Sequence, residues 1–101
     1  MTRSWLLTID YRSRTPQDQI DIADDRLGVC AELLSEHLGE AATDGHYYSV
    51  SVMVETTSPG TALQIGGDLI GAAVQQAGLP SWGIVRTEMI REDEVRRSRV
   101  E

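Results

Sequence analysis

The side chains best suited to metal binding or nucleophilic catalysis in this sequence are two histidines, His37 and His46, and one cysteine, Cys30. They show none of the His-x-His, His-x-x-x-His or Cys-x-x-Cys spacings that bring ligands to one metal ion. Cys30 falls on the apolar face of an expected helix, where a buried thiol is typical and a nucleophile is not. We therefore predict no catalytic residue, no metal site and no cofactor.

The charge balance narrows the classes of partner. The chain has 101 residues, with sixteen Asp and Glu against nine Arg, and its formal net charge is −7. This length fits one domain. The excess of acid argues against nucleic acid and anionic membranes as partners, because both require a basic surface. A single cysteine allows no intrachain disulfide, which favours a cytoplasmic location.

Two stretches of alternating apolar residues predict strands that must position any site. Trp5, Leu7, Ile9 and Tyr11 alternate with more polar neighbours, and a shift of 43 positions places them over Tyr48, Val50, Val52 and Val54. Each stretch is followed by a Ser or Thr and then a Pro (Thr15-Pro16, Ser58-Pro59), the pair that begins helices. The sequence therefore predicts a strand, a helix N-cap and a helix, in that order, at two places in the chain.

The remaining boundaries follow from turn residues. We expect the first helix to run to about Leu38 with Gly39 after it, and the second to about Ala77, followed by Gly78-Leu79-Pro80. Asp44-Gly45 favours a hairpin, which implies a short strand over 40–43. In a last strand from Trp82 to about Ile90, we expect Val85, Thr87 and Met89 to face inward.

These elements give an α+β domain over residues 1–90 and a charged tail or short helix over 91–101. The predicted order β-α-β-β-α-β is that of the ferredoxin-like plait, a two-layer sandwich with an antiparallel sheet and both helices on one face. Without the strand over 40–43, the order would be β-α-β-α-β, which is still a two-layer sandwich.

Four features carry a resemblance to known proteins. They are the first strand with its leading Trp5, the Asp44-Gly45 hairpin, the Ala- and Gly-rich second helix and the closing segment from Val85 to Val95. The chain resembles a diffuse group of small uncharacterised proteins from actinobacteria and their phages. The resemblance implies such a source, and the host cytoplasm as the location if a phage encodes the chain. It supports the plait and implies no catalytic residue.

The first helix offers a candidate partner surface. On a helical wheel, Ile20, Ala23, Leu27, Cys30, Ala31, Leu34 and Leu38 form the core face. An acidic stripe lies almost opposite, made of Asp18, Asp21, Asp25, Glu32 and Glu36. Beside this stripe runs an apolar strip of Ile22, Val29 and Leu33, and an apolar strip with a charged border is typical of an interface. A solvated acidic face, with the strip covered by other parts of the chain, is the alternative interpretation.

The outer face of the predicted sheet is a second candidate partner surface, because it is too apolar to remain exposed to water. Its large apolar members are Leu6, Tyr47, Met53, Ile84 and Ile90. Pairing of two such faces would make a homodimer. The glycines Gly66, Gly67 and Gly71 in the second helix also suggest close backbone approach, either to the first helix or to a second subunit.

Two hypotheses for function follow. The first is a non-enzymatic interaction module, which is dimeric and binds a basic protein through the first helix. The alternative is a small-molecule sensor or small dimeric enzyme with a pocket between sheet and helices, lined by Trp5, Tyr48, Met53 and Trp82.

Overall fold

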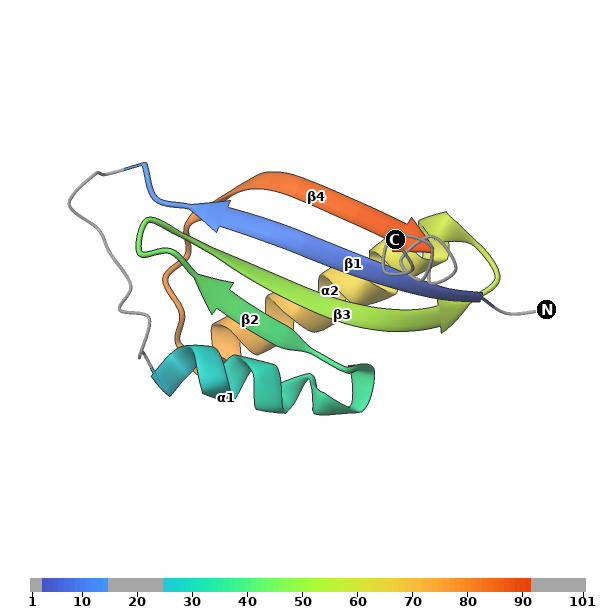
Figure 1. Ribbon diagram of the computed structural model, residues 1–101, viewed down its shortest axis with the longest axis horizontal. Coiled ribbons are helices and arrows are strands. Elements are labelled where there is room, and N and C mark those ends of the chain that lie inside the picture. Colours follow the sequence, from blue (N-terminus) through green and yellow to red (C-terminus); the bar gives the residue numbers. More distant parts are fainter. Residues whose placement is uncertain (1–2, 15–24, 92–101) are drawn as a thin grey trace, which may run out of the picture.

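The computed structural model describes residues 3–14 and 25–91. These residues form four strands, two α-helices and one short 3₁₀ helix, and Figure 1 shows how the strands and α-helices are arranged. In chain order these are β1 (Arg3–Arg12), α1 (Asp25–Leu33), η1 (Ser35–His37), β2 (Glu40–Thr43), β3 (Tyr47–Thr56), α2 (Pro59–Ala77) and β4 (Gly83–Arg91). The predicted strand over 40–43 is therefore confirmed, and Arg91 belongs to the last strand.

The four strands form one antiparallel sheet in the order β2-β3-β1-β4. Strand β1 pairs along its length with β3 on one side and with β4 on the other, from Trp5 opposite Arg91 to Arg12 opposite Gly83. Strand β2 is much shorter than β3 and pairs only with Tyr48–Ser51. The sheet is thus an open one with four strands, accompanied by two helices.

One hydrophobic core joins the sheet to the helices. The alternate residues of β1 and β3 predicted to face inward are buried with Leu27, Cys30 and Leu34 from the α1 region and with the inner face of α2, except Trp5, which is partly buried against this core. Tyr48 lies at its centre with no exposed surface, stacked on Tyr11 at 4.8 Å between ring centroids and tilted against Trp82 at 5.5 Å. The alternation in the sequence identified the inner faces of these two strands correctly.

Helix α2 begins and ends as the sequence predicts. The Ser58 side chain accepts a hydrogen bond from the Thr61 amide, and Pro59 occupies the first turn. Gly78 ends the helix in the left-handed conformation, with φ of 75°. Inside the helix, a Cβ on Gly66 would lie 2.6 Å from Leu7 Cδ2, whereas one on Gly67 or Gly71 would meet nothing within 4 Å. The close approach predicted for these glycines is therefore made by Gly66 alone, and to the sheet.

The expected course of the first helix is wrong at its C-terminal end. Helix α1 ends at Leu33, and η1 follows. Leu38, which we expected on the core face, is 72% exposed and adopts the left-handed conformation with φ of 54°. Gly39 follows it, and a Cβ there would lie only 2.2 Å from Leu34 Cβ. The glycine is therefore required by contact with Leu34, which local helix-ending preferences do not reveal. The predicted start at Thr15-Pro16 lies outside the described residues.

A register shift in β4 corrects the expected facing of two residues. Asp10 pairs with Arg86 but Tyr11 pairs with Ile84, which leaves Val85 as the extra residue of a β-bulge. Ile84 therefore shares the inner side with Tyr11 and was wrongly assigned to the outer face, although it remains 58% exposed on this edge strand. Val85, expected inside, is 60% exposed. Thr87 and Met89 pair with the inward residues Ile9 and Leu7, as predicted, but only Met89 packs against the core and Thr87 is exposed.

The predicted hairpin joins β2 to β3. Thr43 Oγ1 donates to the Tyr47 carbonyl at 2.6 Å and accepts from the Gly45 amide at 3.0 Å. The Asp44 carboxylate accepts from the amides of His46 and Tyr47. These side-chain contacts fix where β2 ends and, with it, how little of β3 it covers.

Candidate protein-binding surfaces

The described part of α1 carries an exposed apolar pair, which we call the α1 strip: Val29 and Leu33. They are 44% and 47% exposed, and their four-residue spacing places them together on the helix surface. The acidic residues Asp25, Glu32 and Glu36 of the predicted border are exposed as well. Ile22, Asp18 and Asp21, which complete the prediction, lie outside the described residues. The strip and its border therefore face solvent wherever the structure describes them.

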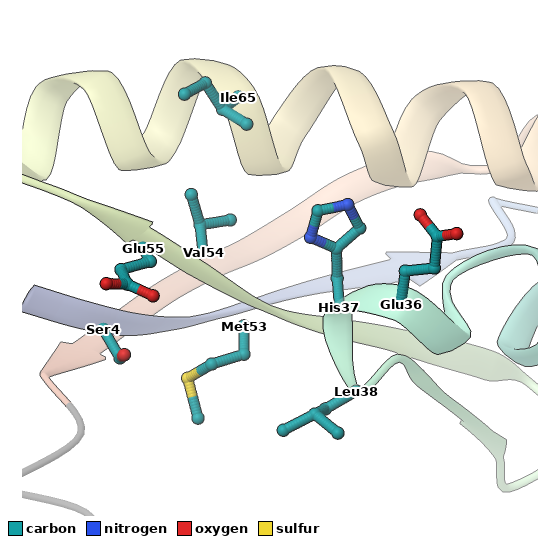
Figure 2. A pocket seen from close by; sticks show the side chains of 8 residues that line it. All are labelled: Ser4, Glu36, His37, Leu38, Met53, Val54, Glu55 and Ile65. Atoms are coloured by element: carbon teal, nitrogen blue, oxygen red, sulfur yellow. The ribbon is translucent and has the colours of Figure 1, made fainter.

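A hollow of about 460 Å³ lies where η1 meets the uncovered end of β3 (Figure 2). We call it the edge hollow. Figure 2 shows Val54, Ile65 and His37 on the helix side of β3, and Met53, Ser4 and Leu38 on the opposite side. The carboxylates of Glu36 and Glu55 complete the lining. The edge hollow therefore extends around the strand edge and reaches both faces of the sheet.

The main chain of β3 faces this hollow. Tyr47 accepts a hydrogen bond from the Asp44 amide on the β2 side of the strand, so its backbone groups point that way. Backbone direction repeats every two residues in a strand, so the amide and carbonyl of Met53 point to the same side. Within the described residues β2 reaches only Ser51, and no strand lies beside Met53 there. The hollow thus borders a short, open sheet edge.

Leu38 stands out in the lining because its backbone and its side chain are both unfavourably placed. The left-handed conformation costs a non-glycine residue about 1–2 kcal/mol, and its apolar side chain remains largely in water. Two backbone hydrogen bonds hold the turn, from the Leu38 amide to the Ser35 carbonyl and from the Gly39 amide to the Leu34 carbonyl. The fold therefore presents an exposed leucine on a fixed turn at the hollow's rim.

The outer face of the sheet has an apolar end and a polar middle. Leu6 pairs with Met53 on one side and with Ile90 on the other, which makes a continuous apolar row across three strands. Next to it, Thr8 and Ser51 share a hydrogen bond of 2.9 Å, Ser49 donates to Asp10, and Arg86 contacts Glu88. Tyr47, opposite Arg12, lies at the far end of this face. Of the predicted outer residues, the structure brings Leu6, Met53 and Ile90 together, but not Tyr47 or Ile84.

Of the four residues proposed to line a small-molecule pocket, Tyr48 and Trp82 are in contact, but Met53 lies on the other face of the sheet. Tyr48 is fully buried, and its hydroxyl donates to the Pro80 carbonyl at 2.6 Å. Met53 lies on the opposite face of the sheet, opposite Leu6. The Trp5 indole N–H donates to the Thr56 carbonyl.

The residues with chemical potential are placed apart. Cys30 is buried, and burial raises the pKa of its thiol, so the protonated form persists at neutral pH. His37 borders the edge hollow, whereas His46 lies in the turn before β3. Within 3–14 and 25–91, no three His, Cys, Asp or Glu side chains form a group that could hold a metal ion.

Sequence reasoning missed the edge hollow, although one signal was present. The predicted strand over 40–43 was already much shorter than its partner, and a short strand cannot cover a long one. The exposed, left-handed Leu38 left no such signal, because leucine before glycine fits a helix end in which glycine takes the left-handed position.

Among the helices in the described part of the chain, none is long and apolar enough to cross a membrane. Comparison of the chain with protein-family models, curated proteins and solved structures finds no match.

Proposed function

We propose that this chain is a non-enzymatic protein-interaction module that binds a partner protein through α1. The observation that carries the proposal is the solvent exposure of Val29 and Leu33 on one helix surface beside acidic residues. Apolar anchors surrounded by a charged rim are the usual composition of a protein interface. Leu27 and Cys30 of the same helix are buried in the core, so they attach α1 to the rest of the fold.

The acidic border favours a basic partner. Asp25, Glu32 and Glu36 are all exposed near the strip, and the chain as a whole carries a net charge of −7. Complementary charge accelerates encounter, and salt screens it. We therefore expect partner association to slow as salt is added, while the apolar contact sets most of the dissociation rate.

The test compares Val29→Asp with Gln76→Asp, a matched control on an exposed position of α2. A tagged protein is used to capture partners from the native host, and light scattering sizes the product. We expect Val29→Asp to lose the complex and Gln76→Asp to retain it, with both variants folded by circular dichroism. Unchanged capture and unchanged molar mass for Val29→Asp would exclude the α1 strip as the interface.

We also propose homodimerisation through the apolar row of Leu6, Met53 and Ile90. The row is continuous across β3, β1 and β4, which favours sheet-to-sheet packing. Leu6→Glu should then shift the molar mass of the purified protein from dimer to monomer, whereas Tyr47→Glu, at the far end of the same face, should leave the dimer intact. A wild-type protein that is monomeric at millimolar concentration would contradict this.

The finer fold assignment belongs with these proposals. The chain order of the elements and the sheet order β2-β3-β1-β4 support a two-layer, ferredoxin-like plait. The cytoplasmic location, the actinobacterial or phage source and the alternative small-molecule function stay predictions. Quenching of the tryptophan fluorescence by a panel of metabolites tests the last of them.

A further inference from the structure

We propose that the open edge of β3 binds an extended, basic peptide segment as an added strand in the edge hollow. This surface is distinct from the α1 strip. The proposal rests on three features that coincide there: an uncovered strand edge, a hollow reaching both faces of the sheet, and an acidic lining.

The uncovered edge supplies the hydrogen bonds. From Val52 to Thr56, β3 has no strand on its β2 side in the described part of the chain, and the backbone of Met53 points that way. Gly39 and Leu38 lead into β2 beside the start of this edge, so an extended peptide would lie beside Met53 to Thr56, for about four residues or roughly 13 Å. Strand addition of this kind draws its affinity from main-chain hydrogen bonds.

The hollow supplies side-chain contacts on both faces. Successive side chains of an added strand point to opposite faces of the sheet. One would meet Val54 and Ile65 on the helix side, and the next would meet Met53 and Leu38 on the other (Figure 2). Both positions favour apolar side chains. Docking would cover Leu38, which is otherwise largely exposed on its left-handed turn.

Charge selects the class of peptide. The lining includes Glu36, Glu55 and His37 and no Arg or Lys; Glu55 also has an interaction within the protein, so Glu36 supplies the clearest negative charge. Glu40, at the start of β2, is exposed nearby in sequence. A second copy of this acidic chain would bring like charges together in the hollow, whereas arginine or lysine at the ends of a peptide would oppose them. A basic segment of a partner protein is therefore the occupant.

The probe is the peptide acetyl-Arg-Val-Val-Val-Arg-amide, labelled with a fluorophore for anisotropy titration against the full chain. We expect saturable 1:1 binding. The same peptide with N-methyl groups on all three valines should bind at least about tenfold more weakly, because the valine nitrogens can no longer donate hydrogen bonds and the methyl groups hinder close approach to a strand. Replacement of both arginines by glutamate should also weaken binding at least about tenfold.

Two protein variants locate the binding site. Leu38→Asn should weaken binding about tenfold while the fold is kept, because asparagine tolerates the left-handed conformation. Val29→Asp should change the affinity less than twofold, so failure of the α1 proposal and failure of this one are separable. In hydrogen exchange, the Met53 amide should become slower with peptide, and the Val52 and Val54 amides, which face β1, should not change.

Three results would overturn the proposal. These are an absence of binding, equal binding of the N-methylated peptide, or an unchanged exchange rate at Met53. A wild-type dimer that becomes monomeric in Leu38→Asn would assign the edge to a second copy of the chain instead.

Discussion

The two helical segments before β2 and β4 end with the same hydrogen-bond pattern but exchange the places of leucine and glycine. At the end of α2, the Gly78 amide bonds to the Gln75 carbonyl and the Leu79 amide to the Val74 carbonyl. At the end of η1, Leu38 and Gly39 make the equivalent bonds to Ser35 and Leu34. Both are Schellman-type ends.

The exchange has opposite consequences for the two leucines. At the α2 end, glycine takes the left-handed position without strain, and Leu79 is 5% exposed in the core. At the η1 end, Leu38 takes the left-handed position and its side chain remains outside. The residues at the end of α2 therefore stabilise the fold. Those at the end of η1 lower its stability, and it is this end that borders the edge hollow.

Gly39→Ala should lower the stability of the protein more than any of the variants that follow. The added Cβ would lie 2.2 Å from Leu34 Cβ and 2.9 Å from the Leu34 carbonyl oxygen, and neither belongs to a flexible side-chain end. We expect the free energy of unfolding in urea to fall by about 3 kcal/mol. Gly71→Ala on α2 is the control, since nothing lies within 4 Å of its Cβ, and it should be neutral or stabilising. A loss below about 1 kcal/mol for Gly39→Ala would show that the turn relaxes easily.

Alanine substitution of Leu79 and of Leu38 should lower the free energy of unfolding by different amounts. Leu79→Ala removes a side chain from the hydrophobic core and should cost about 2 kcal/mol. Leu38→Ala removes an exposed one and should cost less than about 0.5 kcal/mol. Thermal or urea unfolding of both variants measures the difference. Equal losses would mean that Leu38 is buried in solution, as it would be in a dimer formed through the hollow.

Tyr48 makes the α2 end sensitive to alkali. Its hydroxyl donates to the Pro80 carbonyl, and burial raises its pKa above the ordinary value of 10.0, with Tyr11 and Cys30 adding to the shift. The folded state therefore holds this proton longer than the unfolded state, so the stabilisation is complete below about pH 10 and is lost as the pH rises further.

Tyr48→Phe tests this effect. We expect about 1 kcal/mol lower stability at pH 7, from the lost hydrogen bond, and a shallower decline above pH 10. Tyr47→Phe, on the exposed neighbour, is the control and should keep the wild-type alkaline slope. An unchanged slope in Tyr48→Phe would place the alkaline sensitivity elsewhere.

Leu38→Gly should produce the smallest change, and one of opposite sign. Relief of the left-handed strain exceeds the entropy cost of glycine by a small margin, so we expect about 0.5 kcal/mol of added stability. The same variant should lose affinity for the Arg-Val peptide. Calorimetry and anisotropy on one preparation measure both quantities, and a destabilised Leu38→Gly would show that the leucine side chain supports the fold.

Local signals in the sequence predicted most of the fold. The Ser58-Pro59 start and Gly78-Leu79-Pro80 end of α2, the Asp44 hairpin and the strand over 40–43 all depend on neighbouring residues, and all are confirmed. The end of the first helix is wrong because Gly39 is fixed by contact with Leu34, which its own neighbours do not encode. The inward facing of Ile84 was missed because a bulge breaks the alternation that the prediction assumed.

The candidate binding sites also differ in how far the sequence predicts them. Exposure of Val29 and Leu33 could be predicted from helical spacing, because one wheel position decides it. The edge hollow could be predicted only in part, from the shortness of the strand over 40–43, since it needs η1, α2 and the end of β3 together. Sites made by one element can be read from periodicity, whereas sites made between elements require the register and the exact ends of each.

The central place of β1 has a consequence for the order in which the molecule assembles. Strand β1 precedes the other described strands in the chain, but it lies between β3 and β4, so Trp5 can pair with Arg91 only after β4 has been synthesised. Pairing between such distant segments slows folding. Until β4 is made, the edge of β1 that pairs with it stays open, and this strand carries the apolar residues Leu7 and Ile9. A nascent chain with an open strand edge and exposed apolar side chains is one that chaperones bind.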